Sequence, residues 1–236
     1  MKVEDEDGNE EDTIFKQRDF ERKFFSEKTN AIFCKTFFEN ALKDPISGEI
    51  GKTIVFCVSQ HHAAKITQIM NEMAYQLWSD KYNSDFAIQV TSHVKDAQQN
   101  TINFANNNLK GHTKFIEGYK SSKARVCVTV GMMTTGYDCT DILNICLMRP
   151  IFSPSDFVQI KGRGTRKHWF KMEFRDVLPE TNLAIDKEHF KLFDFFANCE
   201  YFEEKFDYDE VLKLPPIGSG KPVEGGTTVN IDTINI

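Results

Sequence analysis

The residues from Gln159 to Arg166 read QIKGRGTR, and their types and spacing suit the binding of an anion. If this stretch is helical, Gln159, Arg163 and Arg166 stand at positions i, i+4 and i+7 and share one helix face. No acid separates the two arginines, and the two glycines of the run leave bare surface where a phosphate could come close. A lone pair of arginines at this spacing is usually a solvated basic turn, so the interpretation needs a second feature.

The second feature is the run 131–138, GMMTTGYD, which follows an apolar stretch. The hydroxyls of Thr134 and Thr135 and the exposed backbone amides of such a loop can bind phosphate oxygens. Gly136 lets a ligand approach the backbone closely, and Asp138 could accept hydrogen bonds from a ribose. Taken alone, the run is equally typical of an ordinary turn.

Gly51-Lys52-Thr53 has the ending of a phosphate-binding P-loop but lacks its other requirements. The full motif needs a glycine five residues before Gly51, where the chain has Ile46. A P-loop also follows a strand and opens a helix, whereas here the apolar run 53–58 comes afterwards and predicts a strand. We interpret the stretch as a loop leading into a strand, so other residues must handle any nucleotide.

The pattern of apolar residues predicts an α/β fold in which helices separate several of the strands. We expect strands at 53–58, 86–90, 125–130, 142–148 and 190–196. We expect helices at about 29–43, 60–78, 97–109 and 112–120, with Ile32 and Leu77 on apolar faces, and a further helix starting at Ser153-Pro154. The strands are mostly continuous apolar runs, which favours a largely parallel sheet covered on both faces. Open sheets of this kind bind ligands beyond the carboxyl ends of their strands, and both candidate stretches follow strands.

Charge and composition divide the chain into three parts. Residues 1–12 carry seven acids and one lysine, a net charge of −6, which equals that of the whole chain of 236 residues. The remainder is therefore neutral, and any contact with nucleic acid has to be local. We predict an acidic tail and approach segment at 1–28, one domain at 29–211, and a linker or tail rich in Pro, Gly and Ser at 212–236. Such ends suggest a piece of a longer protein.

The cysteines and the hydropathy pattern point to the cytoplasm. Six cysteines lack any C-x-x-C spacing and lie mostly in apolar runs, as reduced core cysteines do. There is no apolar run long enough to span a membrane and no signal-like start, so we expect a cytoplasmic chain without a membrane partner. The histidines have no cysteine or acid at ligand spacing, so we expect no metal site.

Together, TTGYD at 134–138 and QIKGRGTR at 159–166 resemble motifs V and VI of superfamily-two helicases and translocases. The longer text, from TIVFCVSQHHAAKI at 53–66 through these motifs to FKLFDFF at 190–196, looks like the motor region of the restriction (R, or HsdR) subunit of type I restriction enzymes. The resemblance covers roughly residues 18–214. Motif VI is the more specific signal for the superfamily, and the restriction-enzyme assignment rests on the longer context.

The resemblance implies that this chain is the second of two RecA-like domains that hold ATP and Mg²⁺ between them, in a three-layer α/β/α fold. The missing first domain would bind most of the cofactor through its P-loop and acidic box. By motif position, the resemblance implies catalytic contact with the γ-phosphate for Arg163 and Arg166, with Arg166 preferred as the arginine finger. It implies ATP binding for Gln159, Gly136 and Asp138. It implies contact with the nucleic-acid backbone for Thr134, Thr135, Ser59, Gln60, His61, Thr91 and Ser92.

The same resemblance implies partners and a mode of action. They are double-stranded DNA, the preceding RecA-like domain and a nuclease domain of the same polypeptide, and the modification and specificity subunits of the complex. The parent would be an ATP-dependent DNA translocase and site-specific deoxyribonuclease, while the fragment alone would be inactive. Two alternatives stay open: the second motor domain of another DNA or RNA helicase, and a nucleic-acid-binding module without enzymatic activity.

Overall fold

The fold is built on a five-stranded sheet in which every neighbouring pair of strands is parallel. The computed structural model describes residues 2–4, 10–12, 26–113, 116, 118–134, 137–172 and 184–205. In the order β4-β5-β3-β6-β9, the strands are Ala87–Gln89, Val126–Thr129, Lys52–Cys57, Ile142–Met148 and Lys191–Asp194. All five lie within or next to the predicted runs, and the expectation of a largely parallel sheet is confirmed.

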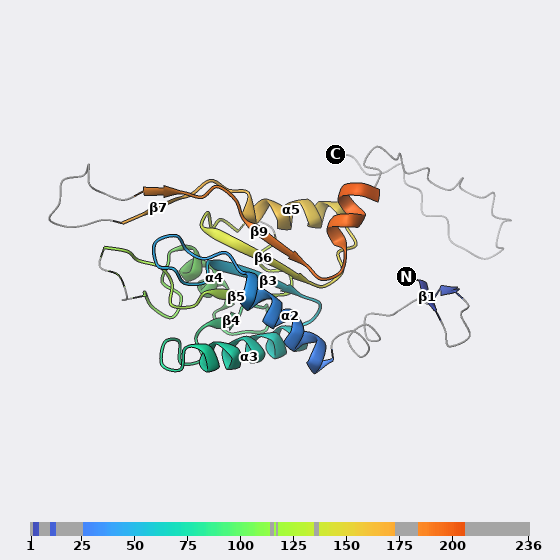
Figure 1. Cartoon of the computed structure of the whole chain (residues 1–236), viewed down its shortest axis with the longest axis horizontal. Coiled ribbons are helices and arrows are strands. Elements are labelled where there is room, and N and C mark those ends of the chain that lie inside the picture. Colours follow the sequence, from blue (N-terminus) through green and yellow to red (C-terminus); the bar gives the residue numbers. More distant parts are fainter. Residues whose placement is uncertain are drawn as a thin grey trace, which may run out of the picture.

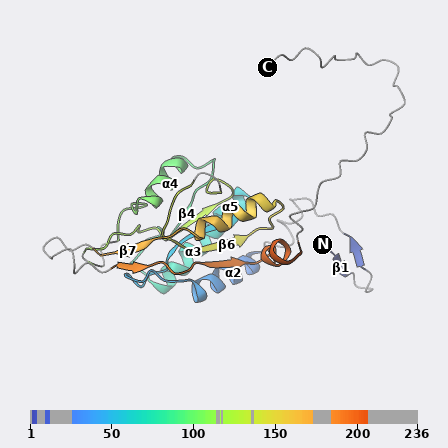
Figure 2. The ribbon, with the colours of Figure 1, turned by 90° about the horizontal axis from the view of Figure 1, so that it is seen from above.

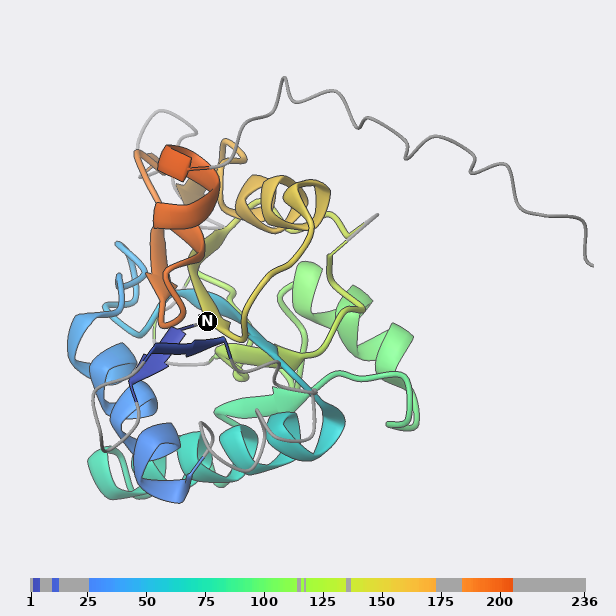
Figure 3. The same ribbon diagram turned by 90° about the vertical axis from the view of Figure 1, so that its right-hand side faces the viewer.

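Helices cover both faces of this sheet and make a RecA-like three-layer α/β/α arrangement (Figures 1 and 3). One face carries α2 (Glu27–Asn40) and α3 (Gln60–Leu77). The other carries α4 (Ala97–Ala105), α5 (Pro154–Gly164) and the π-helical turn η2 (Glu200–Lys205). Within the described parts of the chain, no helix has the length and apolar character needed to cross a bilayer.

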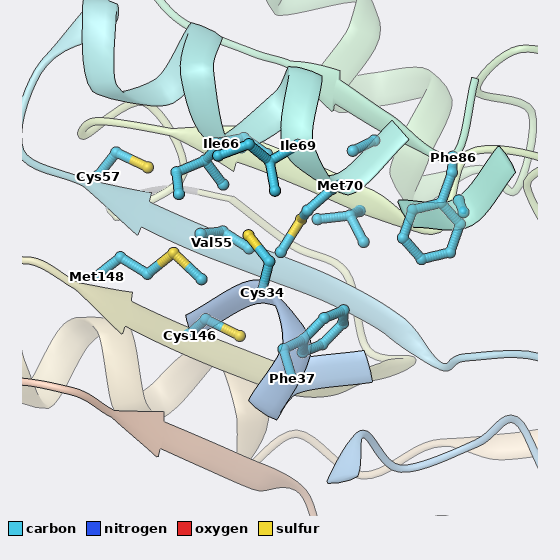
Figure 4. Close-up of a cluster of buried hydrophobic side chains, with 14 of the residues drawn as sticks. Cys34, Phe37, Val55, Cys57, Ile66, Ile69, Met70, Phe86, Cys146 and Met148 are labelled. Carbon is cyan, nitrogen blue, oxygen red and sulfur yellow. The ribbon is translucent and has the colours of Figure 1, made fainter. Parts of the chain in front are cut away.

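Alternate residues of the central strand β3 pack in two separate hydrophobic cores, because successive side chains point to opposite faces of the sheet. Val55 and Cys57 pack under α2 and α3, in the cluster drawn in Figure 4 with Met70 and Phe86. Ile54 and Phe56 pack on the opposite side under α4 and α5. All the side chains of β3 are buried, which explains why the strand reads as a continuous apolar run rather than an alternation.

Two short antiparallel pairs were not foreseen from the sequence. β1 (Lys2–Glu4) pairs with β2 (Glu10–Asp12), and β7 (Trp169–Lys171) pairs with β8 (Ala184–Asp186). The β7–β8 ribbon projects beyond the sheet in both Figure 1 and Figure 2. Its Phe170 is buried against Tyr119 and Leu143, so a small third core holds its base. Three-residue strands are too short to show a period in the sequence.

Several predicted helix details were wrong. Helix α2 ends at Asn40 instead of 43, and Ile32 is 62% exposed, because Asn30, Cys34 and Phe37 form its buried face. Leu77, at the end of α3, is likewise exposed. The described residues of 112–120 are not helical, and His112 instead forms an isolated bridge with Ser122. The domain boundaries at 28/29 and 211/212 stay a prediction.

Candidate functional site

Helix α5 begins as the sequence predicts, and its beginning fixes the direction in which its arginines lie. Ser153 is the N-cap and its Oγ accepts a hydrogen bond from the Asp156 amide at 3.4 Å, while Pro154 occupies the first turn. The helix ends at Gly164 with Thr165 as the C-cap. Arg163 therefore lies in the last turn and Arg166 lies beyond the helix, so the expected single helical face from 159 to 166 does not extend to Arg166.

The two glycines of this run have different surroundings, which corrects the expectation that both leave surface bare for a phosphate. A Cβ at Gly162 would meet nothing within 4 Å. A Cβ at Gly164 would lie 2.2 Å from the Phe190 ring. Gly164 is buried, and its lack of a side chain lets the end of α5 pack against the segment that leads into β9.

Arg163 reaches from α5 to the backbone of the loop at 131–138. Its Nε donates to the Thr134 carbonyl at 3.0 Å, and its Nη1 donates to the Tyr137 carbonyl. Burial lowers the pKa of Arg163, the neighbouring Arg166 charge lowers it further, and the Asp138 carboxylate raises it. The guanidinium thus fills a position between the helix and the loop, close to a second positive charge.

Arg166 forms an ion pair with Asp138 through its Nη1 and the Asp138 Oδ1. The Asp138 side chain is 71% exposed and that of Arg166 is 35% exposed, so solvent reaches the pair. An exposed ion pair contributes only about 0–1 kcal/mol, and another anion can therefore compete for Arg166. The two candidate stretches meet at this pair.

Gln159 lies one turn before Arg163 on α5. Its Nε2 donates to Ser155 Oγ at 3.2 Å. Its Oε1 is buried and has no hydrogen-bond partner among the described residues. A buried amide oxygen without a partner costs free energy, so a donor brought next to this atom would be stabilising.

The loop at 131–138 is anchored by its apolar side chains. Met133 and Tyr137 are buried in the core beneath α4 and α5. Thr134 is only 8% exposed, which differs from the exposed phosphate contact that we expect from the sequence, whereas Gly131 is exposed. Thr135 and Gly136 lie outside the described residues.

A second polar group lies at the carboxyl ends of β3 and β4. Ser59 is the N-cap of α3, as predicted, and its Oγ accepts from the His62 amide at 3.1 Å. The Gln60 side chain joins the two loops, since its Oε1 accepts from the Thr91 hydroxyl and its Nε2 donates to Ser92 Oγ, both at 3.3 Å. The structure thus brings together residues that are 32 positions apart in sequence.

Exposure separates the members of this polar group. Thr91 is 1% exposed, so its hydroxyl supports Gln60 and is not presented to a ligand. His61 and Ser92 are exposed. The surface that a backbone phosphate could reach is therefore formed by His61, Ser92 and the first turn of α3.

Known proteins with similar sequences and structures indicate the family context of this site. No protein-family model matches the chain. The EcoKI endonuclease subunit of a type I restriction enzyme from Escherichia coli K12 is 30% identical over 186 residues, which are 78% of this chain. The chain is homologous to part of a type I restriction endonuclease subunit. The EcoAI endonuclease subunit from E. coli is 26% identical over 184 residues, 75% of this chain.

The chain spans only 13% of the EcoKI subunit and 20% of the EcoAI subunit. A solved structure described as the fragment of an HsdR subunit of a type I restriction enzyme from Vibrio vulnificus superposes with a TM-score of 0.50 at 26% identity. That match covers 75% of this chain and 28% of the Vibrio chain. The likeness therefore concerns a segment of HsdR subunits and agrees with the α/β/α fold.

One arginine of this HsdR-like segment escaped the sequence reasoning. Arg149 follows β6 directly, and its Nη1 donates to the Val130 carbonyl at 3.1 Å. Burial lowers its pKa, while the Asp156 carboxylate raises it. Its Nε is buried and has no hydrogen-bond partner in the described structure. Its position could have identified Arg149 as a candidate site residue, because ligands of parallel sheets bind beyond the carboxyl ends of the strands.

The described residues contain no group of three or more histidine, cysteine or acidic side chains arranged to hold a metal ion. Five of the six cysteines are buried and all six are free. The burial of five of them agrees with the sequence-based interpretation as core cysteines.

Proposed function

We propose that this chain is the second RecA-like motor domain of a type I restriction endonuclease R subunit, a DNA translocase that ATP hydrolysis drives. The observation that carries the proposal is the meeting of loop 131–138 with the end of α5, where Asp138 pairs with Arg166 and Arg163 binds the loop carbonyls. Homology to the HsdR segment supplies the family context. The proposal also predicts a cytoplasmic location.

On the nucleotide side, we assign Arg166 to the γ-phosphate. It is accessible, and its partner Asp138 can be exchanged for a phosphate at little cost. We also assign Gln159, one turn before Arg163 on α5, to the nucleotide side, and Gly136 and Asp138 would face the nucleotide, Asp138 near the ribose. ATP with Mg²⁺ supplies the phosphoryl group whose transfer drives the motor, and the preceding domain would hold most of both.

Arg166 would act by charge stabilisation. A phosphoryl group in transfer spreads negative charge over its equatorial oxygens, and a guanidinium supplied from across a cleft can stabilise that charge. Because Arg166 lies beyond the end of α5 and is anchored mainly by Asp138, its side chain is free to extend toward a facing domain.

On the DNA side, the proposed contacts are to phosphates rather than to bases. They comprise the hydroxyls, amides and ring of Ser59, Gln60, His61 and Ser92, with Thr91 as a buried support. In the loop we keep Thr135 as a proposed contact, whereas the 8% exposure of Thr134 argues for a supporting role there. Such groups grip the backbone of any sequence. The proposed partners are double-stranded DNA, the preceding motor and nuclease domains, and the modification and specificity subunits.

The test is single-turnover ATP hydrolysis by the full-length polypeptide that contains this chain, at saturating ATP and DNA. Arg166→Ala should reduce the rate by about 10³–10⁵-fold. Arg166→Lys should restore little, because an ammonium lacks the planar fork that spans two oxygens. Lys167→Ala, a change at the exposed neighbouring residue, is the matched control and should leave the rate unchanged. Near wild-type hydrolysis by Arg166→Ala would remove this residue as the finger.

ATP hydrolysis by the isolated chain should be absent, because Ile46 replaces the P-loop glycine and Lys52 is buried. Steady DNA-stimulated turnover by the purified wild-type chain would contradict this. Loss of ATP hydrolysis in every full-length preparation that still binds DNA would instead favour the non-enzymatic nucleic-acid-binding module.

A further inference from the structure

Phe152 is the most exposed large apolar side chain among the described residues, with 85% of its surface open to solvent. It lies between the end of β6 at Met148 and Ser153, the N-cap of α5. A phenyl ring in water forgoes the stabilisation that burial would bring. Single exposed apolar residues are nevertheless common on protein surfaces, so exposure alone does not mark a site.

The loop that carries Phe152 is fixed on both sides of the ring. Ile151 is buried, and its amide donates to Asn198 Oδ1 at 2.7 Å. The buried Asn198 also donates through Nδ2 to the Arg149 carbonyl at 3.2 Å. After Phe152 the chain enters α5 at once through the Ser153 cap. The backbone therefore holds the ring in solvent, and the ring cannot fold back without breaking these bonds.

Phe152 stands at the same edge of the sheet as the proposed phosphate contacts. Strands β3 and β6 are paired up to their last residues, so Ser59 and Phe152 follow neighbouring strands. Arg149 Nη1 donates to the Val130 carbonyl at 3.1 Å, which ties the Phe152 loop to the residue before the exposed Gly131. A backbone bound along this edge would therefore pass close to the ring.

The surroundings of the ring suit a nucleic-acid groove better than a protein interface. A protein interface is built around a contiguous apolar core, but the neighbours of Phe152 in the chain are the buried Ile151 and the polar Ser153, and Ser155 is polar and exposed. Arg149 adds a positive charge at the foot of the same loop. The minor groove of duplex DNA is about 6 Å wide, which one ring can fill, whereas the major groove is wide enough for a whole helix.

We propose that Phe152 enters the minor groove of double-stranded DNA and packs on its sugars, beside the phosphate contacts at the carboxyl ends of the strands. This inference rests on the proposed function for the presence of DNA at this edge. Apolar side chains, phenylalanine among them, are suited to the minor groove. A phenyl ring has no hydrogen-bond donor or acceptor, so the contact adds affinity on any sequence, as a translocating motor needs.

The first arm of the test locates the ring on DNA by photocrosslinking, in the full-length polypeptide that contains this chain. Phe152→benzoylphenylalanine should crosslink to a DNA duplex, and mass spectrometry should place the link on a deoxyribose. Trp169→benzoylphenylalanine is the matched control, because Trp169 is also an exposed aromatic but lies on the β7–β8 ribbon at the other end of the sheet (Figure 1). It should give no DNA product.

Two results of the crosslinking would overturn the proposal. A link from position 152 to a thymine methyl group would place the ring in the major groove, where that methyl group lies. A link to protein and not to DNA, whether to another domain or to a second copy, would identify Phe152 as part of a protein interface.

The second arm separates an apolar contact from a phosphate contact through the effect of salt. Phe152→Ala should raise the Kd for a duplex about fivefold or more in fluorescence anisotropy, because apolar burial is lost. The slope of log Kd against log salt should stay that of wild type, because no phosphate contact is removed. Phe152→Tyr should bind nearly as wild type does, and Trp169→Ala should bind like wild type. Equal Kd values for Phe152→Ala and wild type would overturn the proposal.

The two arms also separate this inference from the proposed function. Urea unfolding of Phe152→Ala should match wild type, since the ring is exposed, and weaker binding is then not a folding defect. If the wild-type polypeptide binds no duplex, the motor assignment and this inference both fail. If it binds DNA, and DNA stimulates its ATP hydrolysis, while position 152 neither crosslinks to DNA nor affects Kd, the minor-groove contact alone is wrong.

Discussion

Lys52 Nζ lies 3.0 Å from both carboxylate oxygens of Asp141, and both side chains are almost entirely buried. The same ammonium donates to the Phe104 carbonyl and lies 4.9 Å from the centre of the Phe104 ring. Burial alone would raise the pKa of Asp141, but the Lys52 charge and the hydrogen bonds from Cys139 and Lys52 hold it below its usual value. The lysine of the GKT stretch is thus a structural cation that anchors the segment following loop 131–138.

Changing Lys52 should therefore affect stability. Lys52→Met leaves Asp141 buried without its partner, and the loss of one member of a buried pair costs about 3–5 kcal/mol of unfolding free energy. The double change Lys52→Met with Asp141→Leu should recover most of this loss, because an apolar pair of similar volume needs no charge compensation. Urea unfolding of the three proteins measures both values. A double variant no more stable than Lys52→Met would contradict this account.

Stability should also fall with acid because of His62. Its Nε2 lies 3.2 Å from Asn30 Oδ1, and its Nδ1 accepts from the Val58 amide at 3.4 Å, an arrangement that suits the neutral ring. Burial, and secondarily His61, lowers its pKa from 6.5 to about 4. The unfolded chain therefore binds a proton first, so the contribution of His62 is complete above pH 6.5 and is lost as the pH falls toward 4.

The loss over this interval should be on the order of 3 kcal/mol. Urea unfolding between pH 4 and 7 measures it. His62→Gln, which keeps a donor and an acceptor but does not titrate, should be less stable near neutrality and show a flatter pH profile. His93→Gln, at an exposed position, should keep the wild-type profile. Parallel profiles for wild type and His62→Gln would show that another group is responsible.

The two glycines of QIKGRGTR should respond in opposite directions to alanine. Gly164→Ala forces a Cβ into the Phe190 ring and should cost about 1–3 kcal/mol through overpacking. Gly162→Ala meets open space inside the helix and should stabilise by about 0.5–1 kcal/mol, because alanine loses less backbone entropy. Thermal unfolding of the two variants compares them directly. Equal destabilisation would mean that the helix end packs differently.

DNA binding by the isolated chain should be weak and independent of sequence. Residues 13–236 are neutral in sum, and the proposed contacts are hydroxyls and amides that touch phosphates. Fluorescence anisotropy with unrelated duplexes should give a Kd of about 10⁻⁴–10⁻⁶ M that weakens steeply with salt. A nanomolar, sequence-selective complex that survives high salt would argue for base contacts that the described surface does not suggest.

The parts of this structure that the sequence predicted are those that local patterns determine. Continuous apolar runs located the five parallel strands, and Ser59 and Ser153 marked helix starts through their capping hydroxyls. The likeness of two short motifs to a helicase family pointed to residues 134–138 and 159–166, and the Asp138–Arg166 pair brings these two stretches into contact. Their joint action stays a prediction.

The parts that the sequence did not predict depend on contacts between distant residues. Neither the burial of Thr91 under Gln60 nor the Phe190 ring against Gly164 has a local signal. The sequence likewise gives no signal for the Arg163 hydrogen bonds to two carbonyls, because every residue has a backbone carbonyl. Ile32 shows an error of a different kind, because an apolar residue next to the buried face of a helix was predicted to belong to that face and is exposed.

The reactivity of the buried thiols can be used to measure local unfolding of this domain. Burial raises the pKa of Cys34 and Cys139 to about 12 and that of Cys57, Cys127 and Cys146 as well, so thiolate is scarce in the folded state. An alkylating reagent would then label each thiol only when the helices that cover it move away from the sheet. Since Cys34, Cys57 and Cys146 lie beneath α2 and α3 while Cys127 and Cys139 lie on the opposite side, the order of labelling would reveal which half of the sandwich loosens first.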